Sequence, residues 1–292
     1  MNLVVGATGS LGSEICRLLV AAGKPVRALV RPTSDPDKVA KLESLGVKLV
    51  RGDLKDRGSL DAACRGASAV MSTASSTLSR QEGDSIQTVD MGGQLSLVQA
   101  AKTAGVQNFV LVSFPQVDVE FPLQSAKRAV ERRLKDGGMT YTILQPTFFT
   151  EVWLSPALGF DAANAKAQLY GAGENKISWI SYKDVARFVV ASLDNPAARN
   201  AVIKLGGPDA LSPRQVVQIF EETVGRKFDV QFVPEEALRT QKQGATDAFQ
   251  ESFAALMLYY ARGDVIDMGK TLRKFPGHLV SVREFAQARP HD

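Results

Sequence analysis

Three glycines near the start of the chain have the spacing of a phosphate-binding turn. Gly6, Gly9 and Gly12 follow a short apolar run, 3–5, and lead directly into a segment with the apolar spacing of a helix. Gly6 allows a sharp turn out of a strand, Gly9 lets a pyrophosphate approach the backbone, and Gly12 lets the helix pack closely on a sheet. The helix N-terminus adds free N–H groups and a partial positive charge. An ordinary glycine-rich turn is the alternative. The residues predicted to bind the pyrophosphate of a dinucleotide are Gly6, Thr8, Gly9, Ser10, Leu11 and Gly12.

The residue after the second predicted strand indicates which dinucleotide binds. An NAD site usually has Asp or Glu there, about 20 residues beyond the glycines, to accept a hydrogen bond from the ribose 2′-hydroxyl. This chain has Arg31 instead, and the acidic residues that follow it, Asp35 and Asp37, lie in the next loop. A guanidinium can hold a 2′-phosphate through two parallel hydrogen bonds. The sequence therefore favours NADP(H) over NAD, with a solvated loop arginine as the alternative.

The first half of the chain supplies strands that could position these residues. Short apolar runs without alternation are separated by segments with helical spacing. The predicted strands are 3–5, 25–30, 47–50, 67–72, 109–113 and 140–144, and the predicted helices are 13–22, 39–45, 59–64, 85–104 and 125–135. Such a pattern is typical of a parallel sheet covered by helices on both faces. The predicted fold class is therefore α/β, a doubly wound parallel sheet of the Rossmann type.

The second half of the chain does not continue the regular alternation of apolar strands and helices. Two further strands are predicted at 177–180 and 201–205, and the remainder is mostly helical. We predict an NADP(H)-binding Rossmann domain over 1–155, with 177–206 returning to it. The region 156–292 is predicted to form a smaller, mostly helical domain that binds a substrate or a partner. Open α/β sheets bind ligands beyond the carboxyl ends of their strands, so the site is expected there.

Composition excludes several other classes of protein. Of the 292 residues, 45% are hydrophobic and 23% charged, which argues against disorder. The net charge of +4 is too small an excess to suggest a nucleic-acid-binding protein. Two cysteines and two histidines supply neither a disulfide framework nor a metal-ligand cluster, and no apolar run is long enough to span a membrane. We expect a cytoplasmic protein, or an organellar one if a transit peptide has been removed. The oligomeric state is left open.

Several segments of the chain resemble a known superfamily. These are the turn from Gly6 to Gly12, Leu29-Val30-Arg31, Gly52-Asp53-Leu54, and the run from Tyr141 to Phe149. Together they resemble the atypical short-chain dehydrogenase/reductases, and most closely the NmrA-like and isoflavone-reductase-like branch. The resemblance extends from the first residue to about residue 234 and is weakest in the C-terminal helices. It is specific for the superfamily and the cofactor, and poorly specific for the substrate.

The resemblance implies further cofactor contacts after the third to sixth strands. Asp53 and Leu54 would flank the adenine, and Ala74 and Ser75 would line the ribose and pyrophosphate. Ser113 and Phe114 would form a wall near the nicotinamide. The run from Pro146 to Phe149 would contact the carboxamide face of the nicotinamide and begin the substrate pocket.

The resemblance also implies a role for Lys127. In this superfamily the active-site lysine lies on the helix after the fifth strand, hydrogen-bonds the nicotinamide ribose and supports proton transfer. The segment from Ser125 to Glu131 matches that helix. Alternatively, Lys127 is a solvated lysine on an amphipathic helix, although Arg128, Arg132 and Arg133 could form the exposed face instead.

One position departs from the pattern of the superfamily. Most short-chain reductases have a proton-donating tyrosine four residues before the lysine, where this chain has Leu123. An apolar side chain cannot donate a proton, so carbonyl reduction by that route is in doubt. The enzyme hypothesis is therefore hydride transfer from NADPH to a quinone or a conjugated carbonyl, with Lys127 or water supplying any proton. The aromatic residues that could form flat walls for such a substrate, or simply pack in a core, are Phe148, Phe149, Trp153 and Trp179.

The second hypothesis is a non-catalytic protein that senses NADP(H) and acts as a regulator or assembly factor through protein partners. Some members of the resembling branch bind the dinucleotide without evident turnover. The aromatic segment 253–260 could present a partner surface, but a buried helix is the alternative.

Overall fold

The computed structural model describes residues 1–77 and 80–288. The chain divides into two compact units. The first comprises Met1–Phe114, Pro122–Gln145 and Val185–Ile203, and the second comprises Pro115–Phe121, Pro146–Asp184 and Lys204–Asp292. Each unit is described separately below.

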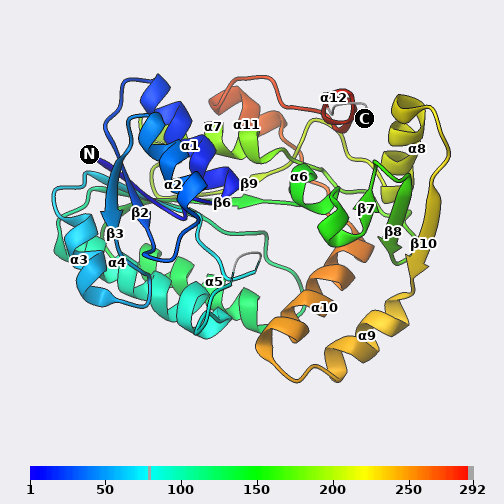
Figure 1. Cartoon of the computed structure of the whole chain (residues 1–292), viewed down its shortest axis with the longest axis horizontal. Helices are drawn as coiled ribbons and strands as arrows, with labels where there is room; N and C mark the ends of the chain where they lie inside the picture. The colour runs from blue at the N-terminus through cyan, green and yellow to red at the C-terminus, as the bar shows by residue number, and fades with distance from the viewer. Residues whose placement is uncertain (78–79, 289–292) are drawn as a thin grey trace. The chain divides into compact units, whose positions relative to one another are not determined.

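A seven-stranded sheet forms the centre of the first unit (Figure 1). Its order is β3-β2-β1-β4-β5-β6-β9, so the chain starts in the middle, moves to one edge and then crosses to the other. The pairs from β3 to β6 are all parallel. The strands are β1 (Asn2–Val5), β2 (Val26–Val30), β3 (Lys48–Arg51), β4 (Ala69–Ser72), β5 (Asn108–Val112), β6 (Thr140–Pro146) and β9 (Ala201–Leu205). This topology confirms the predicted doubly wound Rossmann fold.

Helices connect the parallel strands and cover both faces of the sheet. In Figure 1, α1 and α2 lie on one face, whereas α3, α4 and α5 lie on the other. The helical part of the segment between β4 and β5 begins with a π-helix, η1, which continues directly into α4. The helices are α1 (Ser10–Ala21), α2 (Pro36–Ser44), α3 (Arg57–Cys64), η1 (Ile86–Gly93), α4 (Gln94–Thr103), α5 (Pro122–Lys135), α7 (Tyr182–Ala191) and the 3₁₀ turn η3 (Pro196–Ala198).

Apolar side chains from the strands and helices form the core of the first unit. Phe109 and Leu111 on β5 and Leu97 on α4 are among its fully buried members. Each such side chain contributes about 1.5–3 kcal/mol when it is removed from water. The predicted apolar strands β1, β2, β4 and β5 are thus largely buried, whereas the edge strand β3 is partly exposed.

The second unit contains a small sheet that the sequence did not predict. Its order is β10-β8-β7, with β10 parallel and β7 antiparallel to β8. In contrast, the predicted strand at 177–180 is wrong, since Ile177 and Ile180 form only isolated bridges. The elements of this unit are α6 (Thr150–Trp153), η2 (Pro156–Leu158), β7 (Phe160–Asp161), β8 (Lys166–Tyr170), α8 (Pro213–Val224), β10 (Asp229–Val233), α9 (Glu235–Gln243), α10 (Ala248–Arg262), α11 (Gly269–Lys274) and α12 (Val282–Gln287).

None of the helices in the described part of the chain is both long enough and apolar enough to cross a membrane.

Candidate functional site

The turn between β1 and α1 has the backbone geometry expected of the glycine pattern. Gly6 has a φ of 86°, and a Cβ there would lie 2.7 Å from Thr73 Oγ1 and 2.8 Å from the backbone nitrogen of Ala74. At Gly12 a Cβ would lie 2.2 Å from the carbonyl oxygen of Gly6. Both glycines are therefore required by close packing of the turn against β4 and against itself.

Gly9 leaves space in front of the helix. It is exposed, it caps α1, and an added Cβ would meet only the Gly6 carbonyl oxygen, at 3.4 Å. Among the described residues no side chain caps α1, so the backbone N–H groups of its first turn have no intrahelical acceptor. These groups together with the helix dipole suit an anion such as a pyrophosphate. The turn therefore fits the predicted dinucleotide.

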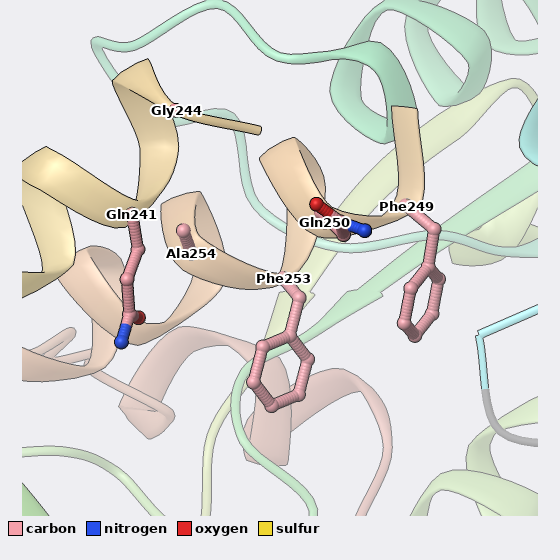
Figure 2. A pocket seen from close by; sticks show the side chains of 6 residues that line it. All are labelled: Gln241, Gly244, Phe249, Gln250, Phe253 and Ala254. Carbon is pink, nitrogen blue, oxygen red and sulfur yellow. The ribbon is translucent and has the colours of Figure 1, made fainter. Parts of the chain in front are cut away.

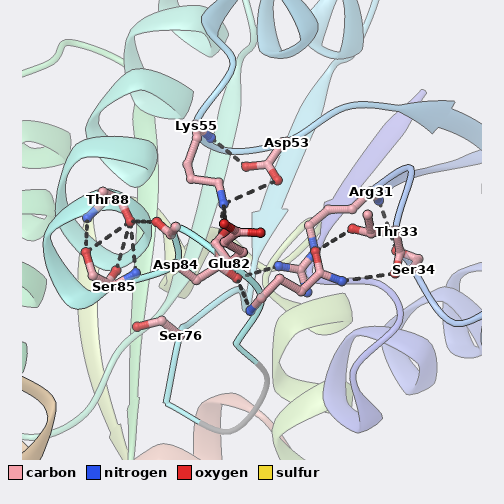
Figure 3. Close-up of polar contacts among 12 residues, drawn as sticks. Arg31, Thr33, Ser34, Asp53, Lys55, Ser76, Glu82, Asp84, Ser85 and Thr88 are labelled. Carbon is pink, nitrogen blue, oxygen red and sulfur yellow. Dashed lines mark hydrogen bonds and ion pairs between the residues drawn. The ribbon is translucent and has the colours of Figure 1, made fainter.

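Arg31 follows β2 and lies in a cluster of charges (Figure 3). Its Nη1 donates a hydrogen bond to Asp84 Oδ2 at 2.6 Å, and Lys55 Nζ donates to Asp84 Oδ1 at 2.5 Å. The backbone amide of Gln81 also donates to Asp84 Oδ2, at 3.0 Å. The side chain of Asp84 is only 1% exposed, whereas those of Arg31 and Lys55 are 26% and 29% exposed. Burial would raise the pKa of Asp84, but the hydrogen bonds from Lys55, Gln81 and Arg31 outweigh it, so the pKa is lowered.

The sequence did not predict two members of this cluster. Asp84 lies 53 residues beyond Arg31 and reaches it only through the fold. Lys55 follows β3, the neighbour of β2 in the sheet, so the two cations come from adjacent strand ends. The signal that could have suggested Lys55 is its place two residues after Asp53, at a strand end already predicted to approach the adenosine.

The residues predicted to contact the adenine lie after β3, and those predicted to line the ribose and pyrophosphate lie after β4. Asp53 is partly buried and accepts a hydrogen bond from the backbone nitrogen of Lys55 at 2.8 Å, while Leu54 is buried. Ala74 and Ser75 are partly buried residues after β4, where Ala74 lies against Gly6. The structure thus brings the strand ends together around the glycine turn. Contact of these residues with a cofactor remains a prediction.

Lys127 is buried rather than solvated. It lies on α5 with 6% of its surface exposed, and its Nζ is 3.2 Å from Oδ1 of Asp90, which is fully buried on η1. Ser76 donates to the other oxygen of Asp90 through its hydroxyl at 2.6 Å and its backbone amide at 3.0 Å. Burial raises the pKa of Asp90, but the charge of Lys127 and the hydrogen bonds from Ser76 lower it by more. Asp90 is therefore the carboxylate partner of Lys127.

The sequence did not predict Asp90 as a partner. The signal was a single carboxylate within an otherwise uncharged helical segment, 86–98, where burial of a charge requires a partner elsewhere. Leu123 is buried on the same helix as Lys127, so the position that holds tyrosine in most short-chain reductases is occupied by an apolar core residue.

Ser113 and Phe114 follow β5 and are held by Arg128. The guanidinium donates to Ser113 Oγ at 3.0 Å and to the carbonyl oxygen of Phe114 at 2.6 Å, and it lies 5.4 Å from the centre of the Phe114 ring. It also lies 3.0 Å from a carboxylate oxygen of Glu131, and its side chain is only 12% exposed. Arg128 therefore does not form an exposed face of α5, as one alternative supposed. It fixes the loop at the end of β5.

The predicted substrate residues belong to the second unit, and three of them, Phe148, Trp153 and Trp179, form part of an aromatic cluster. Pro146 is the last residue of β6 and Phe149 precedes α6, with its ring partly buried. Phe148 packs edge-on against Trp153, with ring centres 4.7 Å apart, and Trp179 is 1% exposed. The structure brings Phe148, Trp153 and Trp179 together, whereas Phe149 makes no ring contact with them among the described residues. Their contact with a substrate remains a prediction.

A shallow hollow of about 360 Å³ lies elsewhere, between α9 and α10 (Figure 2). Phe249 and Phe253 stack beside it with ring centres 6.1 Å apart, and Phe253 is 38% exposed. None of the predicted cofactor or substrate residues lines this hollow. Most residues of the segment 253–260 are buried, while Phe253 lies at the surface.

The sheet order, the glycine turn and the cations at the strand ends define a protein of the Rossmann dinucleotide-binding class. The profile of the NmrA-like family matches residues 2–274. The chain therefore belongs to the NmrA-like family, which confirms the resemblance.

Known proteins of different roles are similar to this chain. The NAD(P)H azoreductase of Xenophilus azovorans is 32% identical in an alignment 298 positions long, which covers 99% of this chain and 97% of the relative. The Photosystem II assembly factor Ycf39 of Trieres chinensis is 28% identical over 80% of this chain and 72% of its own length. Among solved structures, the NADPH-dependent quinone oxidoreductase QOR2 of Escherichia coli, complexed with NADPH, has a TM-score of 0.78 over 98% of each chain. At an identity of 22%, this structural similarity shows a shared fold alone.

Proposed function

We propose that the protein is an NADP(H)-dependent oxidoreductase that reduces an electron-poor small molecule, such as a quinone or a conjugated carbonyl. The observation that carries this proposal is the open turn at Gly9, in front of the uncapped N-terminus of α1. The similarity to the NAD(P)H azoreductase along nearly the whole chain supports the reaction class. An azo compound is also an electron-poor acceptor, so it joins the set of candidate substrates.

The residues of the first unit divide the binding of NADP(H) between them. The first turn of α1 binds the pyrophosphate through its amides, and Arg31 binds the 2′-phosphate through its guanidinium. Asp53 and Leu54 flank the adenine, and Ala74 and Ser75 line the ribose and pyrophosphate. Ser113 and Phe114, fixed by Arg128, form a wall near the nicotinamide. When bound, NADPH supplies a hydride to the acceptor.

Reduction of the acceptor also requires one proton, which balances the hydride. Leu123 cannot donate it, so the candidate donors are water and the ammonium of Lys127. Asp90 fixes the position of this ammonium, because their 3.2 Å ion pair is buried. Lys127 is therefore a fixed group, and its N–H donors can hydrogen-bond the nicotinamide ribose or the reduced acceptor.

Oxidation of NADPH at 340 nm, with a panel of quinones, enones and azo dyes, tests this function. We expect oxidation that depends on at least one acceptor. Lys127→Ala should lower kcat by at least about tenfold while NADPH affinity changes less. Lys135→Ala, at an exposed position of the same helix, is the matched control and should leave both unchanged. An unaltered kcat in a folded Lys127→Ala variant removes the lysine from the mechanism.

The second candidate is an NADP(H)-sensing regulator or assembly factor that acts through protein partners. Two observations favour it, the buried Leu123 in place of the usual tyrosine and the similarity to Ycf39. A ligand shifts a conformational equilibrium only if it binds one state more tightly. Tight NADPH binding without turnover of any acceptor in the panel would favour this candidate. A cytoplasmic location remains a prediction under either function.

A further inference from the structure

The charge cluster after β2 and β3 has the hydrogen-bond donors of an anion-binding site, but a carboxylate of the protein itself accepts their hydrogen bonds. The side chains of Arg31 and Lys55 converge on the carboxylate of Asp84 (Figure 3). Each carboxylate oxygen is bound by one cation, and the backbone amide of Gln81 completes the shell. An acidic group therefore lies where two cations from neighbouring strand ends meet.

This carboxylate is covered by side chains that can move. The side chain of Asp84 is 1% exposed, but the groups over it are the long side chains of Arg31 and Lys55, each more than a quarter exposed. Water and small anions reach such a cluster when either side chain changes rotamer. The ion pairs of Asp84 with Arg31 and Lys55 thus differ from the buried ion pair of Asp90 with Lys127, and they are readily exchanged.

The guanidinium of Arg31 has donors to spare. It carries five N–H groups, and among the described residues Asp84 is its hydrogen-bond acceptor, through Nη1 alone. Arg31 holds the carboxylate of Asp84 through a single hydrogen bond, so it does not use the bidentate geometry that a guanidinium offers to a phosphate. A phosphate monoester carries about −1.5 to −2 charges near pH 7, so two cations match it better than they match one carboxylate.

Resting on the function proposed above, we infer that Lys55 is a second 2′-phosphate-binding residue and that Asp84 is an internal competitor for the same cations. Binding of NADP(H) exchanges the carboxylate of Asp84 for the 2′-phosphate at Arg31 and Lys55. NADH has no group to make this exchange, so Asp84 stays in place when NADH binds. The preference for NADP(H) is therefore weaker than the two cations alone would give.

The competition predicts an increase in affinity when the carboxylate is neutralised. Asp84→Asn keeps the shape of the side chain and can still accept the hydrogen bond from Gln81, but it no longer neutralises the cations. The probes are adenosine 2′,5′-bisphosphate and adenosine 5′-monophosphate, titrated by calorimetry, so that no turnover is needed. Asp84→Asn should bind the bisphosphate roughly tenfold more tightly, the effect of removing two exchangeable ion pairs, and the monophosphate with unchanged affinity.

Two further variants make the test independent of how Asp84→Asn folds. Lys55→Met in the otherwise unchanged protein should weaken the bisphosphate at least about threefold and leave the monophosphate unaltered. Asp194→Asn is the control, because its partner Lys24 precedes β2, whereas Arg31 follows that strand. It also removes one carboxylate from an ion pair, at 2.9 Å, and should change neither affinity.

The outcomes separate this inference from the proposed function. Weaker or unchanged binding of the bisphosphate by Asp84→Asn, or equal gains for both nucleotides, overturns the competition. An unaltered bisphosphate affinity in Lys55→Met overturns the role of Lys55. If the unsubstituted protein binds NADPH in these cases, the proposed function stands without the inference. If it binds neither NADPH nor NADH, the proposed function fails, and the inference fails with it.

Discussion

Replacing Asp90 by asparagine should strongly destabilise the protein, because it leaves the ammonium of Lys127 buried without a counter-ion. The side chain of Asp90 is 0% exposed and that of Lys127 is 7% exposed, with 3.2 Å between the charged atoms. At an effective dielectric constant of about 20, two unit charges at this separation attract by about 5 kcal/mol. Removing one partner of a buried pair typically costs about 3–5 kcal/mol. We expect the low end, since asparagine can still accept a hydrogen bond from Ser76.

A double-mutant cycle isolates the interaction from the cost of each substitution. Asp90→Asn, Lys127→Met and the double variant would be unfolded in urea and followed by circular dichroism. The double variant should be at least about 1–2 kcal/mol more stable than the sum of the single losses predicts, because it leaves no unpaired charge. The exposed pair of Arg57 and Asp61, 2.9 Å apart, is the matched control. Its coupling should stay below about 1 kcal/mol.

The same pair makes a prediction for pH. The pKa of Asp90 is lower in the folded protein than in the unfolded chain, so its contribution to stability is fully present above the unfolded value, about 3.9. The contribution is lost as the pH falls below this value and through the folded pKa. The stability difference between the unsubstituted protein and Asp90→Asn should therefore be constant from pH 8 to about pH 5 and shrink in more acidic solution. Additive losses in the cycle, or a difference that does not shrink in acid, would refute the assigned ion pair.

Two further predictions concern the first unit. Gly9→Ala should leave the melting temperature nearly unchanged but weaken NADPH binding by at least about tenfold, because its Cβ enters the space kept for the pyrophosphate. Gly12→Ala should instead lower the melting temperature, since its Cβ would lie 2.2 Å from a carbonyl oxygen; equal effects of the two variants on melting would contradict this division. Burial raises the pKa of Cys16 to about 12 and that of Cys64 to about 11, so neither thiol should react with Ellman's reagent at pH 8 until denaturant is added. Rapid labelling of the native protein would show that one of these thiols is accessible.

The parts of the fold that the sequence predicted are those determined by local pattern. The inner strands β1, β2, β4 and β5 of the large sheet are short, mostly apolar and largely buried, so their composition alone identifies them. The strands β8 and β10 were not predicted because each carries polar residues, Gln168 and Gln231, and gains stability by pairing within the small sheet. Conversely, Ile177 and Ile180 form isolated bridges rather than a strand, since an apolar run can be buried without joining a sheet.

In the candidate site, too, local features could be predicted from the sequence and long-range contacts could not. The glycine turn is contiguous, and each of its requirements is met within the turn and the strand beside it, so its geometry follows from the sequence. The partners of Arg31 and Lys127 could not be predicted in this way. Each is a carboxylate on a distant segment, and many acidic residues of the chain are equal candidates until the fold brings one of them close.

Both of these carboxylates lie in the single segment that follows β4, which gives that segment a distinct electrostatic role. Asp84 and Asp90 each neutralise a cation that the sequence assigned to the cofactor. Their difference in burial separates their effects. Asp84 is covered by partly exposed side chains, so salt screens its ion pairs and a phosphate can replace it. Asp90 is enclosed by η1 and α5, so its pair with Lys127 is little affected by salt and persists whether or not a ligand binds. Raised ionic strength should therefore weaken the recognition of the 2′-phosphate while leaving Lys127 in position. One segment thus supplies an exchangeable counter-charge at the adenosine end and a permanent one at the lysine.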